Sequence, residues 1–362
     1  MPGAMGNSNR LDWVDAAKGL SILLVVMMYA AYNLGEHTGQ IGVLHYIIGF
    51  ATPFRMPEFF LISGLFLSQV IDRPWRRYAD RRVVHYLYFY VVWVAIDFIL
   101  KSGIAQQDGV VMVKGIALAM IQPYGVLWFI YMLAVFSVTA KLCAQLRLPH
   151  WLVIAAAAAL QMAQIQSPSY AVTQFAAYFV FFHVGYVGAA YVFRIVDAAT
   201  RHPGRAWAAL AAWAAAEAFL VFWPDGRVEP MAMHMGLAAF APLHLALAVA
   251  GAIALCVLAC LLMRLPYTDW LRWLGAHSLV VYLAFTLPMS AVRIVLAKTG
   301  LLADPSAVAI VVFVSSVFAP VLLYLAIKRF GIGEFLFERP AWAHLPDGSD
   351  KRGKPLSVEP AE

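Results

Sequence analysis

Residues 45–71 read HYIIGFATPFRMPEFFLISGLFLSQVI, a long apolar run that contains Arg55 and Glu58. A spacing of three residues places these two side chains on one face of a helix. A charged side chain within hydrocarbon costs roughly 3 kcal/mol or more unless it pairs or faces a wet cavity. Pro53 and Pro57 also interrupt helical hydrogen bonding. We therefore predict a broken membrane helix in which Arg55 pairs with Glu58, forming the floor of an active site or permeation path.

The composition of the chain is that of an integral membrane protein. Of its 362 residues, 63% are hydrophobic and 13% are charged, whereas a soluble domain is about half apolar and a quarter charged. The net charge of +6 does not indicate nucleic-acid binding, because the basic residues cluster in short loops between apolar runs. We interpret the three cysteines as small core side chains and expect no metal site.

Ten apolar runs are long enough to predict membrane spans. They lie at residues 17–34, 45–71, 83–100, 125–142, 151–165, 173–193, 206–223, 236–263, 276–297 and 306–327. An eleventh run, 110–122, is shorter and contains Lys114, so it spans, re-enters or lies at the interface. If it does not cross, most of the 26 Lys and Arg residues fall on one side, which the positive-inside rule makes cytoplasmic.

The predicted fold is therefore an all-α bundle of about ten transmembrane helices in a lipid bilayer. We expect one membrane domain, residues 1–337, and a polar, disordered tail, residues 338–362, because the tail is rich in proline and charge. We interpret the first apolar run as a span rather than a cleaved signal peptide. Both termini are predicted to be cytoplasmic.

The first predicted helix carries two polar side chains on one face. Lys18 and Tyr29 are eleven positions apart, which is about 16 Å along a helix and close to three full turns. A cation at the membrane edge and a polar ring deeper inside suit a ligand with an anionic head and a buried reactive end. The alternative is that Lys18 extends to the interface and Tyr29 packs in the core.

Two stretches resemble the acyltransferase-3 family. They are RLDWVDAAKG at residues 10–19, which runs into ILLVV at 22–26, and FRMPEFFLISG at 54–64, with weaker matches at 127–129 (LWF) and 275–283 (GAHSLVVYL). The family consists of multi-helix membrane enzymes that O-acylate carbohydrates. The resemblance implies transfer of an acetyl or succinyl group from an acyl-coenzyme A co-substrate to a hydroxyl of a glycan or lipid-linked sugar. It further implies a bacterial-type inner membrane, and no permanently bound cofactor is expected.

Within the family, the first helix carries an arginine and, eleven positions later, a histidine regarded as catalytic. Lys18 and Tyr29 hold these positions here. Lysine still neutralises a phosphate, although without the two-pronged contact of a guanidinium. A phenol with an ordinary pKa of about 10 is a poor general base at neutral pH. We therefore expect Lys18 to bind the donor and Tyr29 to donate a hydrogen bond.

The base must then come from another residue. His45 opens the broken helix and is our candidate, ahead of His37 in the preceding loop; the alternative is that His45 is an interfacial residue. The resemblance gives Arg55, paired with Glu58, the role of shaping the site and polarising the thioester carbonyl. For His183, within a later span, we expect a hydrogen bond to a neighbouring carbonyl rather than a place in the site.

A row of five arginines follows the broken helix: Arg73, Arg76, Arg77, Arg81 and Arg82. As topology signals they need no further explanation. As a site, Arg76, Arg77, Arg81 and Arg82 are predicted to bind the phosphates of coenzyme A.

A second class of function stays open. The chain is alternatively a non-catalytic relative or a small permease that binds or carries a charged or amphiphilic solute. The first helix of close relatives distinguishes these interpretations: a histidine throughout at the position of Tyr29 makes this chain an inactive outlier.

Overall fold

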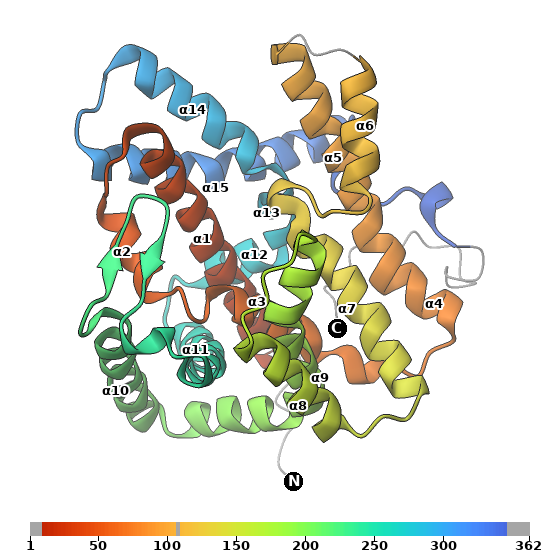
Figure 1. The fold of residues 1–362 in the computed structure, drawn as a ribbon, viewed down its shortest axis with the longest axis vertical. Coiled ribbons are helices and arrows are strands. Elements are labelled where there is room, and N and C mark those ends of the chain that lie inside the picture. Colours follow the sequence, from red (N-terminus) through yellow and green to blue (C-terminus); the bar gives the residue numbers. More distant parts are fainter. Residues whose placement is uncertain (1–8, 106–108, 346–362) are drawn as a thin grey trace. The chain divides into compact units, whose positions relative to one another are not determined.

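The structure is a computed structural model that describes residues 9–105 and 109–345 (Figure 1). It is almost entirely helical, with one two-stranded hairpin. Within the described ranges, seven helices are long and apolar enough to cross a membrane. They are Asp12–Thr38, Trp75–Leu100, Gly125–Gln145, Tyr170–Arg201, Pro203–Phe222, Ala241–Leu262 and Pro305–Phe330. An eighth span forms if the pair Ser278–Ala284 and Thr286–Thr299, bent by 51°, crosses as one. The all-α membrane fold is confirmed.

The predicted count of ten spans is not confirmed. The run at 151–165 forms a helix of only 13 residues, α8 (His150–Met162), about 20 Å long against a hydrocarbon core of roughly 30 Å. The run at 45–71 is divided between two short helices. The run at 110–122 forms α6 (Gly109–Ala119), whose 11 residues are too few to cross as a straight helix.

The chain folds into two compact units, and the first comprises residues up to 62 together with residues 188–326. Its helices are α1 (Asn9–Thr38), α2 (Val43–Phe50), most of α3 (Arg55–Leu65), the end of α9 (Tyr170–Arg201), α10 (Pro203–Phe222), α11 (Ala241–Leu262), α12 (Asp269–Ala276), α13 (Ser278–Ala284), α14 (Thr286–Thr299) and most of α15 (Pro305–Phe330). Strands β1 (Arg227–Val228) and β2 (Met233–His234) pair antiparallel beside α2 (Figure 1).

The predicted break in the second apolar run is confirmed. Helix α2 ends at Phe50 and α3 begins at Arg55, so the break lies at Pro53. Pro57 falls in the first turn of α3, where a missing amide proton costs nothing. The break is packed by aromatic rings, since Phe54 lies 5.7 Å from Phe50 and 5.3 Å from Trp213 between ring centroids.

Helix α1 crosses α12 at two glycines. An added Cβ on Gly19 would lie 2.5 Å from the Leu271 carbonyl oxygen, and one on Gly275 would lie 2.8 Å from the Gly19 nitrogen. Such close backbone approach requires residues without side chains. Gly19 belongs to a stretch that carries the sequence resemblance, 10–19, and Gly275 to one of the weaker matches, 275–283, so both segments contribute to this helix crossing.

The second unit comprises residues 63–187 and the residues from 327 onward. Besides the end of α3 and the first part of α9, it contains η1 (Leu67–Gln69), α4 (Trp75–Ala79), the π-helical turn η2 (Asp80–Val84), α5 (His85–Ala105), α6, η3 (Gly125–Leu127), α7 (Trp128–Gln145), α8, and the turns η5 (Glu334–Leu336) and η6 (Ala341–Ala343). Of the predicted tail, residues 338–345 make defined contacts, and residues 346–362 lie outside the described residues.

Candidate functional site

Glu58 lies in the interior of the first unit. It is fully buried on α3, and one carboxyl oxygen contacts the Ser21 hydroxyl of α1. Ser21 Oγ also lies 2.9 Å from the Ala17 carbonyl oxygen, and a hydroxyl has one proton, so it donates to one of the two at a time. The other carboxyl oxygen of Glu58 has no hydrogen-bond partner among the described residues. Glu58 therefore retains an unused acceptor in a dry environment.

Arg55 does not pair with Glu58, so this prediction was wrong for the described chain. Arg55 Nη1 instead donates to the Ile48 carbonyl, at 3.2 Å, and to Thr52 Oγ1, at 3.3 Å. The reason is the helix break: the Thr52 amide turns to Gly49 and leaves the Ile48 carbonyl without its usual helical partner. Arg55 thus caps the C-terminal end of α2, where a positive charge is favourable.

His45 is buried at the start of α2 with both ring nitrogens bonded. Nδ1 accepts a hydrogen bond from the Gly42 amide at 3.1 Å, so Nε2 carries the proton and donates to the Pro230 carbonyl at 3.2 Å. The histidine therefore ties α2 to the loop of the β1–β2 hairpin. Acting as a base would require Nε2 to leave Pro230.

Lys18 and Tyr29, the two predicted residues of α1, each contact another side chain of the first unit. Lys18 Nζ lies 3.1 Å from Asp15 Oδ1, and both side chains are mostly covered. The Tyr29 ring packs against Phe285 with centroids 5.3 Å apart. An anionic ligand at Lys18 would have to compete with Asp15.

The predicted phosphate-binding arginines lie in the second unit. Arg76 and Arg77 are on α4, and Arg81 and Arg82 are on the π-helical turn η2. Arg81 and Arg82 are half-buried, and within the described part of the chain neither has a hydrogen bond or ion pair. A π-helical turn is rare and frequently occurs at functional sites. These two guanidiniums are available to an anion.

Lys141 holds the loop that leads into this arginine row, and the sequence analysis gave it no place in the site. It is buried on α7 and donates to two backbone carbonyls, those of Ile71 and, at 2.9 Å, Arg73. Its ammonium also lies 5.4 Å from the centre of the Tyr78 ring. A buried lysine thereby fixes the loop that leads into α4.

A histidine pair in the second unit was also missed. His183, fully buried on α9, does not bond a carbonyl as expected: its Nε2 lies 3.4 Å from Nδ1 of His150, an exposed residue at the start of α8. Tyr186 packs against both rings. No sequence signal connects positions 33 residues apart on separate helices. No group of three metal-ligating side chains occurs among the described residues.

The predicted residues thus occupy separate environments. Glu58 makes a polar contact between α1 and α3, through Ser21, whereas Lys18, Arg55 and His45 bond within their own segments or to the hairpin. The arginines form their own group in the second unit. Each group combines buried polar atoms with the apolar surroundings of a membrane helix.

Comparison with known proteins identifies the family. The family described as "Acyltransferase domain" (acyltransferase 3) matches residues 11–325. The chain belongs to the acyltransferase-3 family. It is similar to the inner membrane protein YcfT of Escherichia coli (strain K12), at 28% identity over 169 residues, which are 38% of this chain and 45% of that protein. The chain therefore matches less than half the length of this relative. No solved structure matches the chain.

The match places an acyltransferase domain over residues 11–325 of the chain. The spans Ala241–Leu262 and Pro305–Phe330, the two most apolar of the seven in the described ranges, are consistent with a bilayer environment. The family match also includes η2 with Arg81 and Arg82, and α3 with Glu58. Both groups of polar residues therefore lie within the acyltransferase domain.

Proposed function

We propose that the protein is an O-acyltransferase that moves an acetyl or succinyl group from a coenzyme A thioester to a hydroxyl of a glycan or lipid-linked sugar. The observation that carries the proposal is the family match over residues 11–325. Arg81 and Arg82, half-buried near one end of a membrane span, support it because guanidiniums bind phosphates well. Arg76 and Arg77 extend the same basic segment.

The proposed reaction needs a proton acceptor. The acceptor hydroxyl oxygen attacks the thioester carbonyl carbon, its proton passes to a base on the protein, the carbon–sulfur bond breaks, and the departing sulfur takes up a proton. Glu58 has an unused carboxyl oxygen in the described chain, whereas both ring nitrogens of His45 are bonded. We therefore favour Glu58 over His45 as the proton acceptor. Because Glu58 is fully buried, substrate reaches it only after neighbouring side chains move.

Other predicted residues take supporting roles in this proposal. Arg55 polarises the thioester carbonyl while Nη1 holds the end of α2. Tyr29 donates a hydrogen bond to the reacting groups, and Lys18 contributes to donor binding after release from Asp15. The arginines, Lys18 and both termini are then cytoplasmic, where coenzyme A thioesters are made, and reporter fusions at the two ends of the chain test this orientation.

A non-catalytic relative or small permease is the second candidate. Two features favour it: tyrosine stands where the family's first helix carries a histidine, and His45 is held by Gly42 and Pro230. In that case Arg55, Glu58 and the arginines would bind a charged solute without group transfer.

Transfer of radiolabel from acetyl- and succinyl-coenzyme A, measured in membranes containing the native chain, tests the proposal. Glu58→Gln should lower the rate about 100-fold or more, as expected for loss of a general base. Glu217→Gln is the matched control: Glu217 is likewise a fully buried glutamate of the first unit, on α10, and it has no role in the proposed transfer. Glu217→Gln should therefore transfer label normally.

Each outcome has a definite meaning. Full activity of Glu58→Gln would refute the assignment of the base. Label that appears only in Tyr29→His would show that the native chain is a non-catalytic relative. Absence of label in both, together with uptake of a charged solute into vesicles, would favour the permease.

A further inference from the structure

Asp80 is the acidic residue within the arginine segment Trp75–Val84. Arg76 and Arg77 precede it by four and three positions, a spacing at which helical side chains of opposite charge pair. Asp80 is buried, and an unpaired carboxylate there would be costly. The sequence alone would therefore pair Asp80 with its neighbouring arginines and reduce the positive charge of the row.

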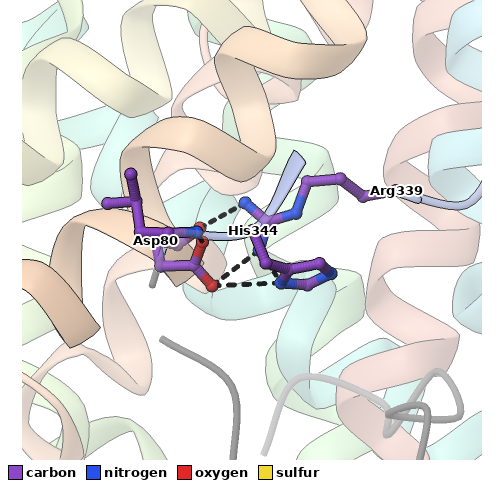
Figure 2. A network of polar contacts seen from close by, with 4 residues as sticks. Asp80, Arg339 and His344 are labelled. Carbon is purple, nitrogen blue, oxygen red and sulfur yellow. Dashed lines mark hydrogen bonds and ion pairs between the residues drawn. The ribbon is translucent and has the colours of Figure 1, made fainter. Parts of the chain in front are cut away.

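The structure gives Asp80 different partners, all from the far end of the chain (Figure 2). Arg339 Nη2 donates to Asp80 Oδ2 at 2.6 Å, and its Nη1 donates to the Asp80 backbone carbonyl at 2.7 Å. The Leu345 amide donates to Oδ1 at 2.8 Å. Both carboxylate oxygens are thus occupied, and the side chains of Asp80 and Arg339 are only 2% and 4% exposed.

His344 supports the arginine in this contact. Arg339 Nη2 lies 2.6 Å from His344 Nδ1, which accepts because a guanidinium can only donate. The same nitrogen lies 3.3 Å from Asp80 Oδ2 (Figure 2). The imidazole therefore holds the guanidinium on the carboxylate.

Residues 334–345, here termed the C-terminal clasp, are fastened along α5 as well. Tyr88 donates its hydroxyl to the Phe335 carbonyl at 3.0 Å, and Trp93 Nε1 donates to the Leu336 carbonyl at 2.9 Å. Glu338 pairs with Lys328 at the end of α15. The clasp is therefore held at several points, and among its described residues Arg339, His344 and Leu345 bond to Asp80.

Arg81 and Arg82 follow Asp80 directly on η2, half-buried and without a hydrogen bond or ion pair in the described part of the chain. We propose that Arg339 and His344 are positioning residues for anion binding: by holding Asp80, they keep its carboxylate from pairing with the arginine row. Arg81 and Arg82 then receive phosphate groups. With coenzyme A as the ligand, this inference rests on the proposed function.

The test uses purified full-length protein and measures binding of radiolabelled coenzyme A by equilibrium dialysis. Arg339→Gln releases Asp80, whose charge then pairs with the row, so Kd should rise about tenfold, the effect of one charged hydrogen bond. The double variant Asp80→Asn with Arg339→Gln removes the competing carboxylate and should restore Kd to within about twofold of native. Arg339→Lys, which retains the charge, should give an intermediate value.

Glu338→Gln is the matched control. It removes an ion pair of the clasp without touching Asp80, so coenzyme A binding should stay at the native level. Thermal unfolding of every variant checks that the comparison is between folded proteins. If Arg339 only stabilised the clasp, the added Asp80→Asn substitution would not restore coenzyme A binding, because Arg339 would still be missing.

The results separate this inference from the proposed function. The positioning role would be overturned if coenzyme A binding were equally weak in Arg339→Gln and the double variant, or native in both. A native protein that does not bind coenzyme A would also overturn it. If coenzyme A binding is weaker in Arg339→Gln and restored in the double variant, but the protein transfers no acyl group, the inference is supported and the proposed acyl transfer is refuted.

Discussion

Replacing Gly19 by alanine tests the contact between α1 and α12. The new Cβ would lie 2.5 Å from the Leu271 carbonyl oxygen and 2.9 Å from a Leu271 methyl carbon. A carbon–oxygen contact needs about 3.3 Å, so the helices must separate locally by roughly 0.8 Å. Overpacking against backbone costs about 1–3 kcal/mol, offset by up to about 1 kcal/mol because alanine is the better helix former. We expect a net loss of about 1–2 kcal/mol.

The assay is thermal unfolding of purified protein, followed by tryptophan fluorescence. At roughly 2 °C per kcal/mol for a chain of this size, Gly19→Ala should lower Tm by about 2–4 °C. Gly275→Ala should lower it further, because its Cβ would overlap the Asp15 carbonyl group. Gly204→Ala is the matched control: it also lies in a helix, and an added Cβ there meets no atom within 4 Å. Native-like unfolding of both Gly19→Ala and Gly275→Ala would refute the tight crossing.

Three further substitutions test individual hydrogen bonds. Lys141→Met should destabilise the protein by about 2 kcal/mol, since the Ile71 carbonyl loses a charged donor, and a denaturation midpoint equal to the native value would contradict this. His45→Ala should speed hydrogen exchange of the β1–β2 hairpin, which His45 holds through Pro230; unchanged exchange would show that the hairpin is held by other contacts. Tyr90→Phe removes a hydroxyl that donates to one backbone carbonyl at 2.6 Å and accepts from one amide at 3.0 Å, so Tm should fall by about 2–4 °C, and a Tm within 1 °C of native would refute the assignment.

Sequence reasoning succeeded where local chemistry decides the outcome. The break at Pro53 follows from the missing amide proton of proline and needs no tertiary information. The all-helical membrane fold likewise follows from composition and the length of apolar runs. The number of spans did not follow, because hydropathy does not register that α8 stops after 13 residues.

The partners of polar side chains were harder to predict. Helical spacing suggested that Arg55 would pair with Glu58, but the break left the Ile48 carbonyl without its amide donor, and this carbonyl accepts from the Thr52 hydroxyl and the Arg55 guanidinium instead. Asp80 and Arg339 are 259 positions apart, and no periodicity within either segment connects them. Long-range ion pairs depend on how segments pack, which a single sequence does not specify.

The π-helical turn η2 has a consequence for how this segment tolerates changes in length. A π-turn contains one more residue than the α-helical turn it replaces, so deleting any one residue from Asp80–Val84 would restore an ordinary helix. The wider turn accommodates the extra residue without rotating the helix that follows, so Tyr88 and Trp93 would still face the clasp carbonyls they now bind. A deletion in the regular helix between Val84 and Tyr88 would instead rotate the rest of α5 by about 100° and turn both side chains away. Among homologues, we expect single-residue deletions in this helix to fall within Asp80–Val84.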